Sequence, residues 1–99
     1  MSSPSLEFHP DARTDVLEAY DWYAERSQVA ADEFQEELQR AGIAIQRSPQ
    51  LWGNYLHGTR QYLMKRFPYI VVYRLTEDRI EIIAVIHGRR RPGFWKGRL

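Results

Sequence analysis

The sequence has no cysteine among its 99 residues. This absence excludes disulfide bridges, thiol nucleophiles and thiolate metal sites. The sequence also lacks any apolar run close to the roughly eighteen residues of a membrane-spanning helix. Its first residues do not combine a basic region with an apolar stretch, so no secretory signal is expected. The simplest interpretation is a cytoplasmic protein that does not enter a membrane.

Patterns that hold metals or cofactors are missing as well. The histidines, aspartates and glutamates do not follow a metal-binding spacing, and no glycine-rich loop resembles a phosphate cradle. We therefore expect neither a metal nor a cofactor.

Acidic residues are scarce in the second half of the chain, and basic residues are scarce in the first. Residues 1–50 carry ten acidic and four basic side chains, whereas residues 51–99 carry three and ten, for a net charge of +1. This segregation predicts an acidic and a basic surface with different roles. The alternative is ordinary solvated charge that happens to segregate.

The composition is that of one folded domain. The hydrophobic fraction is 43% and the aromatic fraction is 13%, which is enough for a core in a chain of this length. We expect a single domain over residues 1–99, with residues 1–4 flexible.

Hydrophobic spacing predicts a short strand at residues 5–9 and two helices, from Pro10 to near Arg26 and from Ser27 to just before Pro49. A loop at residues 49–59 leads into three β-rich runs, of which the last two cover residues 69–75 and 80–86. The prediction is an α+β fold in which a helical hairpin packs on a mainly antiparallel four-stranded sheet. Both late strands are apolar at nearly every position, so the second face of the sheet should be at least partly covered.

The last strand ends in His87 and is followed by three consecutive arginines, Arg89, Arg90 and Arg91. A rigid sheet that presents clustered cations at its edge is suited to an anionic target. The alternatives are a histidine that only forms a hydrogen bond at a strand end, and arginines that are only solvated.

Local strings in this order resemble the RelE/ParE family of bacterial toxins. They are FHPDAR at residues 8–13, YDWY at 20–23, FPYIVVY at 67–73 and AVIHGRRRP at 84–92, with Trp95 beyond. The resemblance covers roughly residues 5–96. It implies the toxin of a type II toxin–antitoxin (plasmid stabilisation) module, neutralised by a cognate antitoxin, with a homodimer or a hetero-oligomer as open possibilities. Some members of the family cleave messenger RNA on the ribosome and others poison DNA gyrase, so the fold alone does not choose the target.

A ribonuclease of the RelE kind needs a proton acceptor, an acid and cations around one phosphate. The candidates here are His87, Arg89 and Lys65. The resemblance places the family's sheet lysines on Gln61 and Leu63 and its arginine on Ile70.

The family's terminal tyrosine falls on Trp95, whose indole cannot carry a proton. These departures favour a ParE-like toxin that acts on gyrase. A RelE-like ribonuclease is the first alternative, and a non-toxic interaction protein that keeps the fold is the second.

Six residues are the predicted contacts with the target or the antitoxin. They are Lys65, Arg66, Arg89, Arg90, Arg91 and Trp95. For Trp95 the alternative is a packing anchor.

Overall fold

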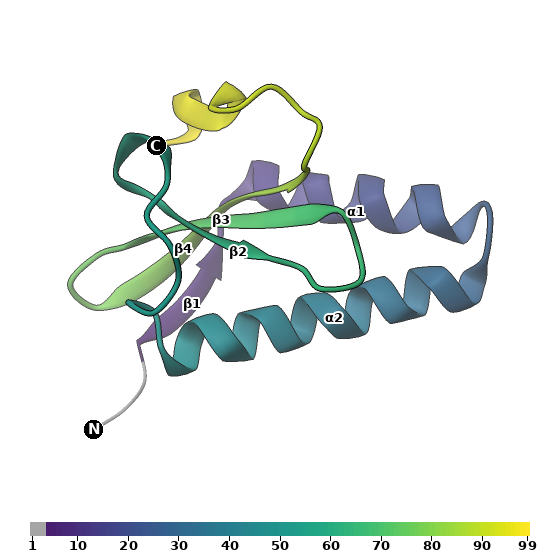
Figure 1. Ribbon diagram of the computed structural model, residues 1–99, viewed down its shortest axis with the longest axis horizontal. Helices are drawn as coiled ribbons and strands as arrows, with labels where there is room; N and C mark the ends of the chain where they lie inside the picture. Colours follow the sequence, from purple (N-terminus) through teal and green to yellow (C-terminus); the bar gives the residue numbers. More distant parts are fainter. Residues whose placement is uncertain (1–3) are drawn as a thin grey trace.

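The structure is a computed structural model that describes residues 4–99 as two α-helices, four strands and two short 3₁₀ turns (Figure 1). In chain order the elements are β1 (Ser5–Phe8), α1 (Pro10–Ala24), α2 (Gln28–Arg47), η1 (Leu56–Gly58), β2 (Arg60–Leu63), β3 (Tyr69–Leu75), β4 (Arg79–His87) and η2 (Phe94–Arg98). This order confirms the prediction of one strand, two helices and three strands. Flexibility was predicted for residues 1–4, of which residues 1–3 lie outside the described part of the chain.

Local sequence signals fix both helix starts. Pro10 is the first residue of α1, and the His9 Nδ1 atom caps it by accepting a backbone N–H at 3.0 Å. The Ser27 Oγ atom caps α2 in the same way at 3.2 Å. α2 ends shortly before Pro49, since proline cannot continue a helix.

The four strands form one mixed sheet in the order β1-β4-β3-β2. β1 lies at one edge and runs parallel to β4, whereas β4, β3 and β2 pair antiparallel. The sheet is therefore mainly antiparallel, as predicted. A register shift between Val72 and Tyr73 marks an irregularity in the β3–β4 ladder.

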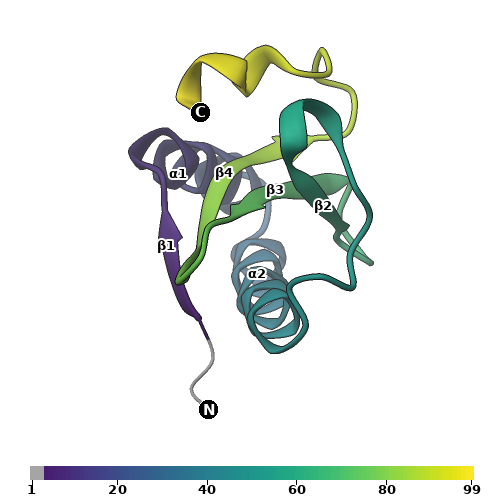
Figure 2. The ribbon, with the colours of Figure 1, turned by 90° about the vertical axis from the view of Figure 1, so that its left-hand side faces the viewer.

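The helical hairpin covers one face of the sheet (Figure 2). α2 buries the side chains of Phe34, Ala41 and Ile45, and Leu38 packs against this core half-buried. Burying a large apolar side chain contributes about 1.5–3 kcal/mol, so this layer is a principal source of stability.

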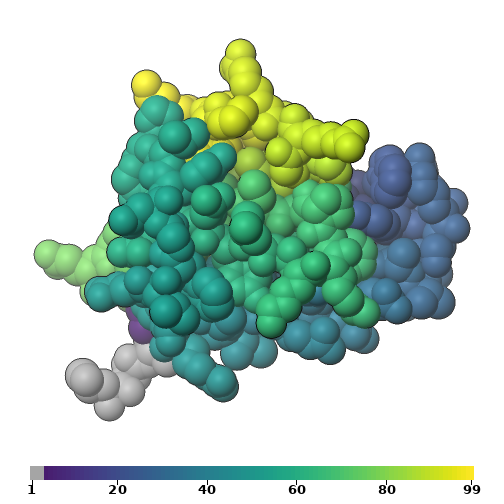
Figure 3. All heavy atoms as spheres, viewed as in Figure 1, coloured from purple at the N-terminus to yellow at the C-terminus, as the bar shows by residue number. Residues whose placement is uncertain are grey.

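The C-terminal segment covers the opposite face of the sheet, a closure that the sequence predicted only in part. The Trp95 side chain is fully buried there against Val72, Ile83 and Ile86. The ring of Tyr55, from the loop that the sequence predicted at residues 49–59, lies 5.9 Å from the Trp95 ring. In the space-filling view this loop, in teal, adjoins the yellow C-terminal residues (Figure 3).

Candidate functional site

The cationic turn, residues 88–91, follows β4 and is held in place by backbone hydrogen bonds. The Gly88 N–H donates to the Pro68 carbonyl at 2.8 Å, and the Arg90 N–H donates to the His87 carbonyl at 3.0 Å. The Arg90 guanidinium lies 4.0 Å from the centre of the Phe94 ring. The turn therefore presents its cations from a fixed backbone.

The three arginines of this turn are exposed and carry uncompensated charge. None of them forms an ion pair within residues 4–99. By contrast, Arg74 pairs with Glu81 at 2.8 Å and Arg79 pairs with Glu7 at 3.2 Å. The cationic turn is therefore the densest cluster of unpaired cations in the basic half of the described chain, because several other arginines there are neutralised.

Arg66 and Lys65 belong to the turn between β2 and β3. The Arg66 N–H donates to the buried Glu37 carboxylate of α2 at 3.1 Å, and the Arg66 Nε atom lies 3.6 Å from it. Arg66 therefore ties this turn to the helical layer, while Lys65 stays exposed without an ion pair in the described part of the chain. Helical spacing alone does not reveal that Glu37 has this buried backbone partner.

His87 lies at the end of β4, where its ring stands edge-on to Tyr69 at 5.4 Å. Its Nδ1 atom accepts the Arg89 N–H at 3.1 Å. In a neutral imidazole the other nitrogen then carries the proton, so no lone pair is left to accept one from a substrate. This arrangement matches the interpretation of His87 as a strand-end hydrogen-bond partner.

The four positions at which the resemblance expected catalytic side chains lie on or against one face of the sheet. Gln61 and Leu63 pair directly with β3 residues of the face away from the helices, and the partner of Leu63 is Ile70. Ile70 packs with Trp95 in the apolar cluster of that face. Gln61, Leu63, Ile70 and Trp95 thus place no cation at these four positions, whereas a phosphate in transfer requires positive charge. Arg74, which follows Val72 on the same face, is paired with Glu81.

The predicted contact role of Trp95 needs correction. Its exposed fraction is 0%, so the indole cannot touch a partner in this conformation. The structure favours the alternative, a packing anchor. The Trp95 Nε1–H is buried without a hydrogen-bond partner among residues 4–99, which lowers the stability gained from burying the ring.

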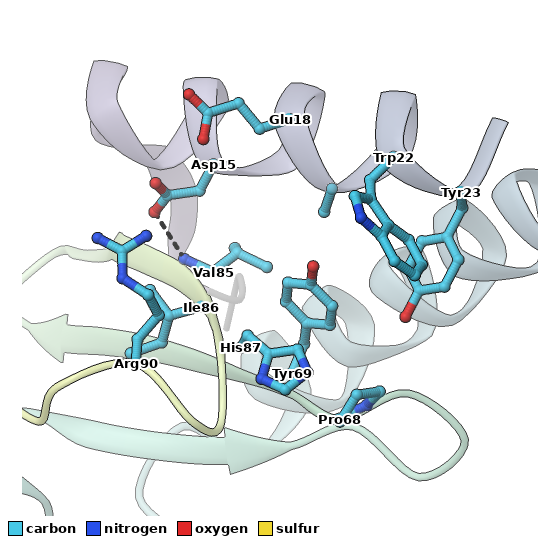
Figure 4. Close-up of a pocket in the computed structure, with 11 residues that line it drawn as sticks. Asp15, Glu18, Trp22, Tyr23, Pro68, Tyr69, Val85, Ile86, His87 and Arg90 are labelled. Carbon is cyan, nitrogen blue, oxygen red and sulfur yellow. Dashed lines mark hydrogen bonds between the residues drawn. The ribbon is translucent and has the colours of Figure 1, made fainter. Parts of the chain in front are cut away.

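A cavity of about 510 Å³ opens between α1 and the ends of β3 and β4 (Figure 4). Trp22 and Tyr23 line it from α1, and Tyr69 and His87 line it from the sheet. Arg90, from the cationic turn, stands at its other side. The cavity thus brings an aromatic wall next to an uncompensated cation.

Asp15, from α1, closes one end of this cavity. Its carboxylate accepts the Val85 N–H at 3.1 Å and two N–H groups of Arg98 at 2.7 and 3.2 Å. Arg98 also donates to the Ile83 carbonyl at 3.0 Å. Only 13% of the Asp15 side chain is exposed, so the ion pair is largely shielded from water. Residues 83 positions apart form it, which local spacing could not indicate.

Tyr73 should make stability sensitive to alkaline pH. Burial raises the pKa of its phenol to about 12 from the ordinary 10, although Arg60 acts in the opposite direction. The folded state thus favours the neutral phenol, and this contribution is complete below pH 10. It is lost as the pH rises from about 10 to 12, by up to about 3 kcal/mol. Urea unfolding measured across this range should show the loss.

Tyr73→Phe is the matched variant. It removes the hydrogen bond from the Tyr73 hydroxyl to the Pro49 carbonyl at 2.7 Å, which should cost about 1 kcal/mol at neutral pH. It should also flatten the alkaline slope. Some slope should remain, because burial raises the pKa of Tyr23 and Tyr69 as well. Equal slopes for the variant and the parent protein would show that Tyr73 is not the titrating group.

Within residues 4–99 no three histidine, aspartate or glutamate side chains are grouped so that they could hold a metal ion. Neither described helix is long and apolar enough to cross a membrane.

Comparisons with known proteins agree with one another. A family model described as the ParE toxin of a type II toxin–antitoxin system, parDE, matches residues 6–92. The curated protein Toxin ParE2 of Mycobacterium tuberculosis, found in two strains, is 28% identical over 88 residues, which is 88% of this chain and 84% of the relative. A solved structure of a chromosomal ParDE TA system from P. aeruginosa superposes with a TM-score of 0.76 at 18% identity, covering 86% of this chain and 96% of the other. This last likeness concerns the fold.

Proposed function

Because the chain belongs to the ParE toxin family of type II toxin–antitoxin systems, we propose that it acts on DNA gyrase and that a cognate antitoxin neutralises it. The proposal places its action in the cytoplasm, where bacterial DNA lies. The solved relative is described as a ParDE toxin–antitoxin system, which supports an antitoxin as the partner.

One observation carries the choice of gyrase over the ribosome. The sheet positions at which a RelE-like ribonuclease would hold its cations are uncharged here, with Leu63 beside Ile70 and Trp95 packed nearby. Messenger RNA cleavage by proton transfer needs a base and an acid near the phosphate, usually worth a hundred- to ten-thousandfold in rate. Since His87 has no free lone pair, the described residues offer this chemistry little support.

The cationic turn is the contact surface that we propose for the target or the antitoxin, with Lys65 as a further contact. Its charge is exposed and uncompensated, so it can attract an acidic surface and speed association. Arg66 contributes less in this proposal, because it is held by Glu37.

The purified toxin should inhibit supercoiling by purified gyrase and should cause no codon-specific cleavage of messenger RNA on translating ribosomes. The triple variant Arg89→Ala/Arg90→Ala/Arg91→Ala should be about tenfold weaker on gyrase, because it removes the uncompensated cations. The control is Arg13→Ala/Arg47→Ala, which removes two exposed cations elsewhere that also lack an ion pair within residues 4–99.

The antitoxin encoded beside the toxin gene should relieve the inhibition. In cells, expression of the toxin alone should arrest growth with filamentation. Robust ribosome-dependent cleavage that is lost on His87→Ala or Arg89→Ala would establish the ribonuclease alternative instead. A healthy culture with confirmed soluble toxin would favour the non-toxic interaction protein.

A further inference from the structure

β4 is longer than the strand that covers its outer edge. β1 pairs with residues 79–82 and then leaves the sheet at His9, whose N–H donates to the Ile82 carbonyl at 2.8 Å. The next groups on this edge are satisfied by side chains, since Arg98 donates to the Ile83 carbonyl and Asp15 accepts the Val85 N–H. Edge pairing by a strand therefore stops before β4 does.

Two further backbone groups on the same edge have no hydrogen-bond partner within residues 4–99, the Val85 carbonyl and the His87 N–H. The Val85 N–H points away from β3, so the Val85 carbonyl and the His87 N–H point the same way in an extended strand. The bonds of β3 are consistent with this orientation. Tyr69 lies opposite His87, but its N–H donates to the Phe67 carbonyl and its carbonyl accepts the Met64 N–H, so neither group bonds to His87. Within residues 4–99 neither group has a partner in a loop, a turn or a side chain.

These two groups open into the cavity described above, which residues 85–87 line directly (Figure 4). A side chain of an added strand lies on the same face of the sheet as the β4 side chain opposite it. The two faces of an added strand would therefore meet different surroundings. Val85 packs in the helix-side core and Ile86 packs in the cluster on the opposite face. An added residue beside Ile86 would thus point its side chain toward the face of the C-terminal segment and Arg90. Its two neighbours would point toward the aromatic wall that includes Trp22.

We propose that this edge binds an extended segment of a partner protein as an added strand, with the side-chain pattern apolar–acidic–apolar. The acidic residue would face the cationic turn, and the apolar residues would enter the aromatic wall. The chain already contains such a pairing, because Leu6-Glu7-Phe8 lies parallel to β4 on the same edge, with Glu7 held by Arg79. Strand addition to an open edge is a common mode of peptide recognition.

The free groups also favour a direction. In a parallel arrangement one added residue beside Ile86 donates its N–H to the Val85 carbonyl and accepts the His87 N–H. In an antiparallel arrangement two added residues share these bonds. Their remaining groups would then meet the Val85 N–H and the His87 carbonyl, which Asp15 and the Arg90 N–H already occupy. The added strand should therefore run parallel to β4, in line with β1.

The test uses the full-length toxin and a capped peptide, Ac-Ala-Leu-Glu-Phe-Ala-NH2, followed by amide-resolved NMR. Binding should shift the His87 amide signal and slow its hydrogen exchange. A peptide N-methylated at the glutamate, and one with lysine in its place, should each bind about three- to tenfold more weakly, since each loses one stabilising interaction. The triple alanine variant of the cationic turn should weaken binding similarly, and the Arg13→Ala/Arg47→Ala control should not.

Three outcomes would overturn the proposal. One is no binding at millimolar peptide, and another is equal binding of the N-methylated peptide. The third is a short DNA duplex that shifts the amide signals of the cationic turn while the peptide leaves the His87 amide signal unchanged, which would assign the turn to nucleic acid.

The proposal rests on the proposed function, because it names how a protein partner is held. The two can fail separately, since peptide binding is measured without gyrase and gyrase inhibition is measured without the peptide.

Discussion

Replacing Trp95 with alanine should lower the free energy of unfolding by about 3–5 kcal/mol, a large part of the stability of a domain of this size. The indole is fully buried between the sheet and the loop that carries Tyr55, and alanine would leave a cavity there. The loss should also expose the apolar cluster that contains Val72 and Ile83. Urea unfolding followed by circular dichroism measures the change.

Two further variants make this test specific. Trp22→Ala is the matched control, because 51% of Trp22 is exposed and its loss should cost about 1 kcal/mol, mainly from the Arg26 guanidinium stacked on its ring at 3.7 Å. Trp95→Phe should cost clearly less than Trp95→Ala, since it keeps most of the ring and removes the buried N–H that has no partner within the described chain. A cost below 1 kcal/mol for Trp95→Ala would show that the C-terminal segment does not pack on the sheet in solution.

Asp15→Ala should have the second largest effect, a loss of about 2–4 kcal/mol. The substitution leaves the Arg98 guanidinium, which is only 15% exposed, with no carboxylate but the exposed Asp11 at 3.8 Å. It also leaves the Val85 N–H without its acceptor. Glu18→Ala is the matched control on the same helix. Glu18 is exposed and forms no ion pair within residues 4–99, so its loss should change stability by less than about 0.5 kcal/mol.

A double-mutant cycle separates the ion pair from the rest of this network. Asp15→Ala/Arg98→Met removes both charges, so it should be less destabilising than the sum of the single changes by about 1–3 kcal/mol. Additive losses would mean that the two side chains do not interact across the cavity end. The same variants bear on the open edge of β4, because Asp15 and Arg98 hold the groups immediately before it.

Local sequence patterns were enough to predict the helices and strands and their order. Pro10, Ser27 and Pro49 act on the backbone within a few residues, so the helix boundaries could be predicted closely. The continuous apolar runs of β3 and β4 predicted strands whose second face is at least partly covered. The run of arginines was also visible in the sequence, as were Leu63 and Ile70 at positions where RelE-like ribonucleases carry cations. These features favoured a ParE-like toxin over a ribonuclease.

The tertiary structure alone decided which charged residues remain free and which edge stays open. Asp15 and Glu37 have the spacing of surface residues, yet each accepts a backbone N–H from a distant strand or turn. Trp95 was a predicted contact, but its burial depends on a sheet face assembled from residues far away in the chain. Such pairings depend on how layers meet in space, and the energy of each charge depends on the partner and the solvent it finds there. The open edge at Val85 and His87 arises in the same way, because β1 ends where α1 must begin while β4 continues.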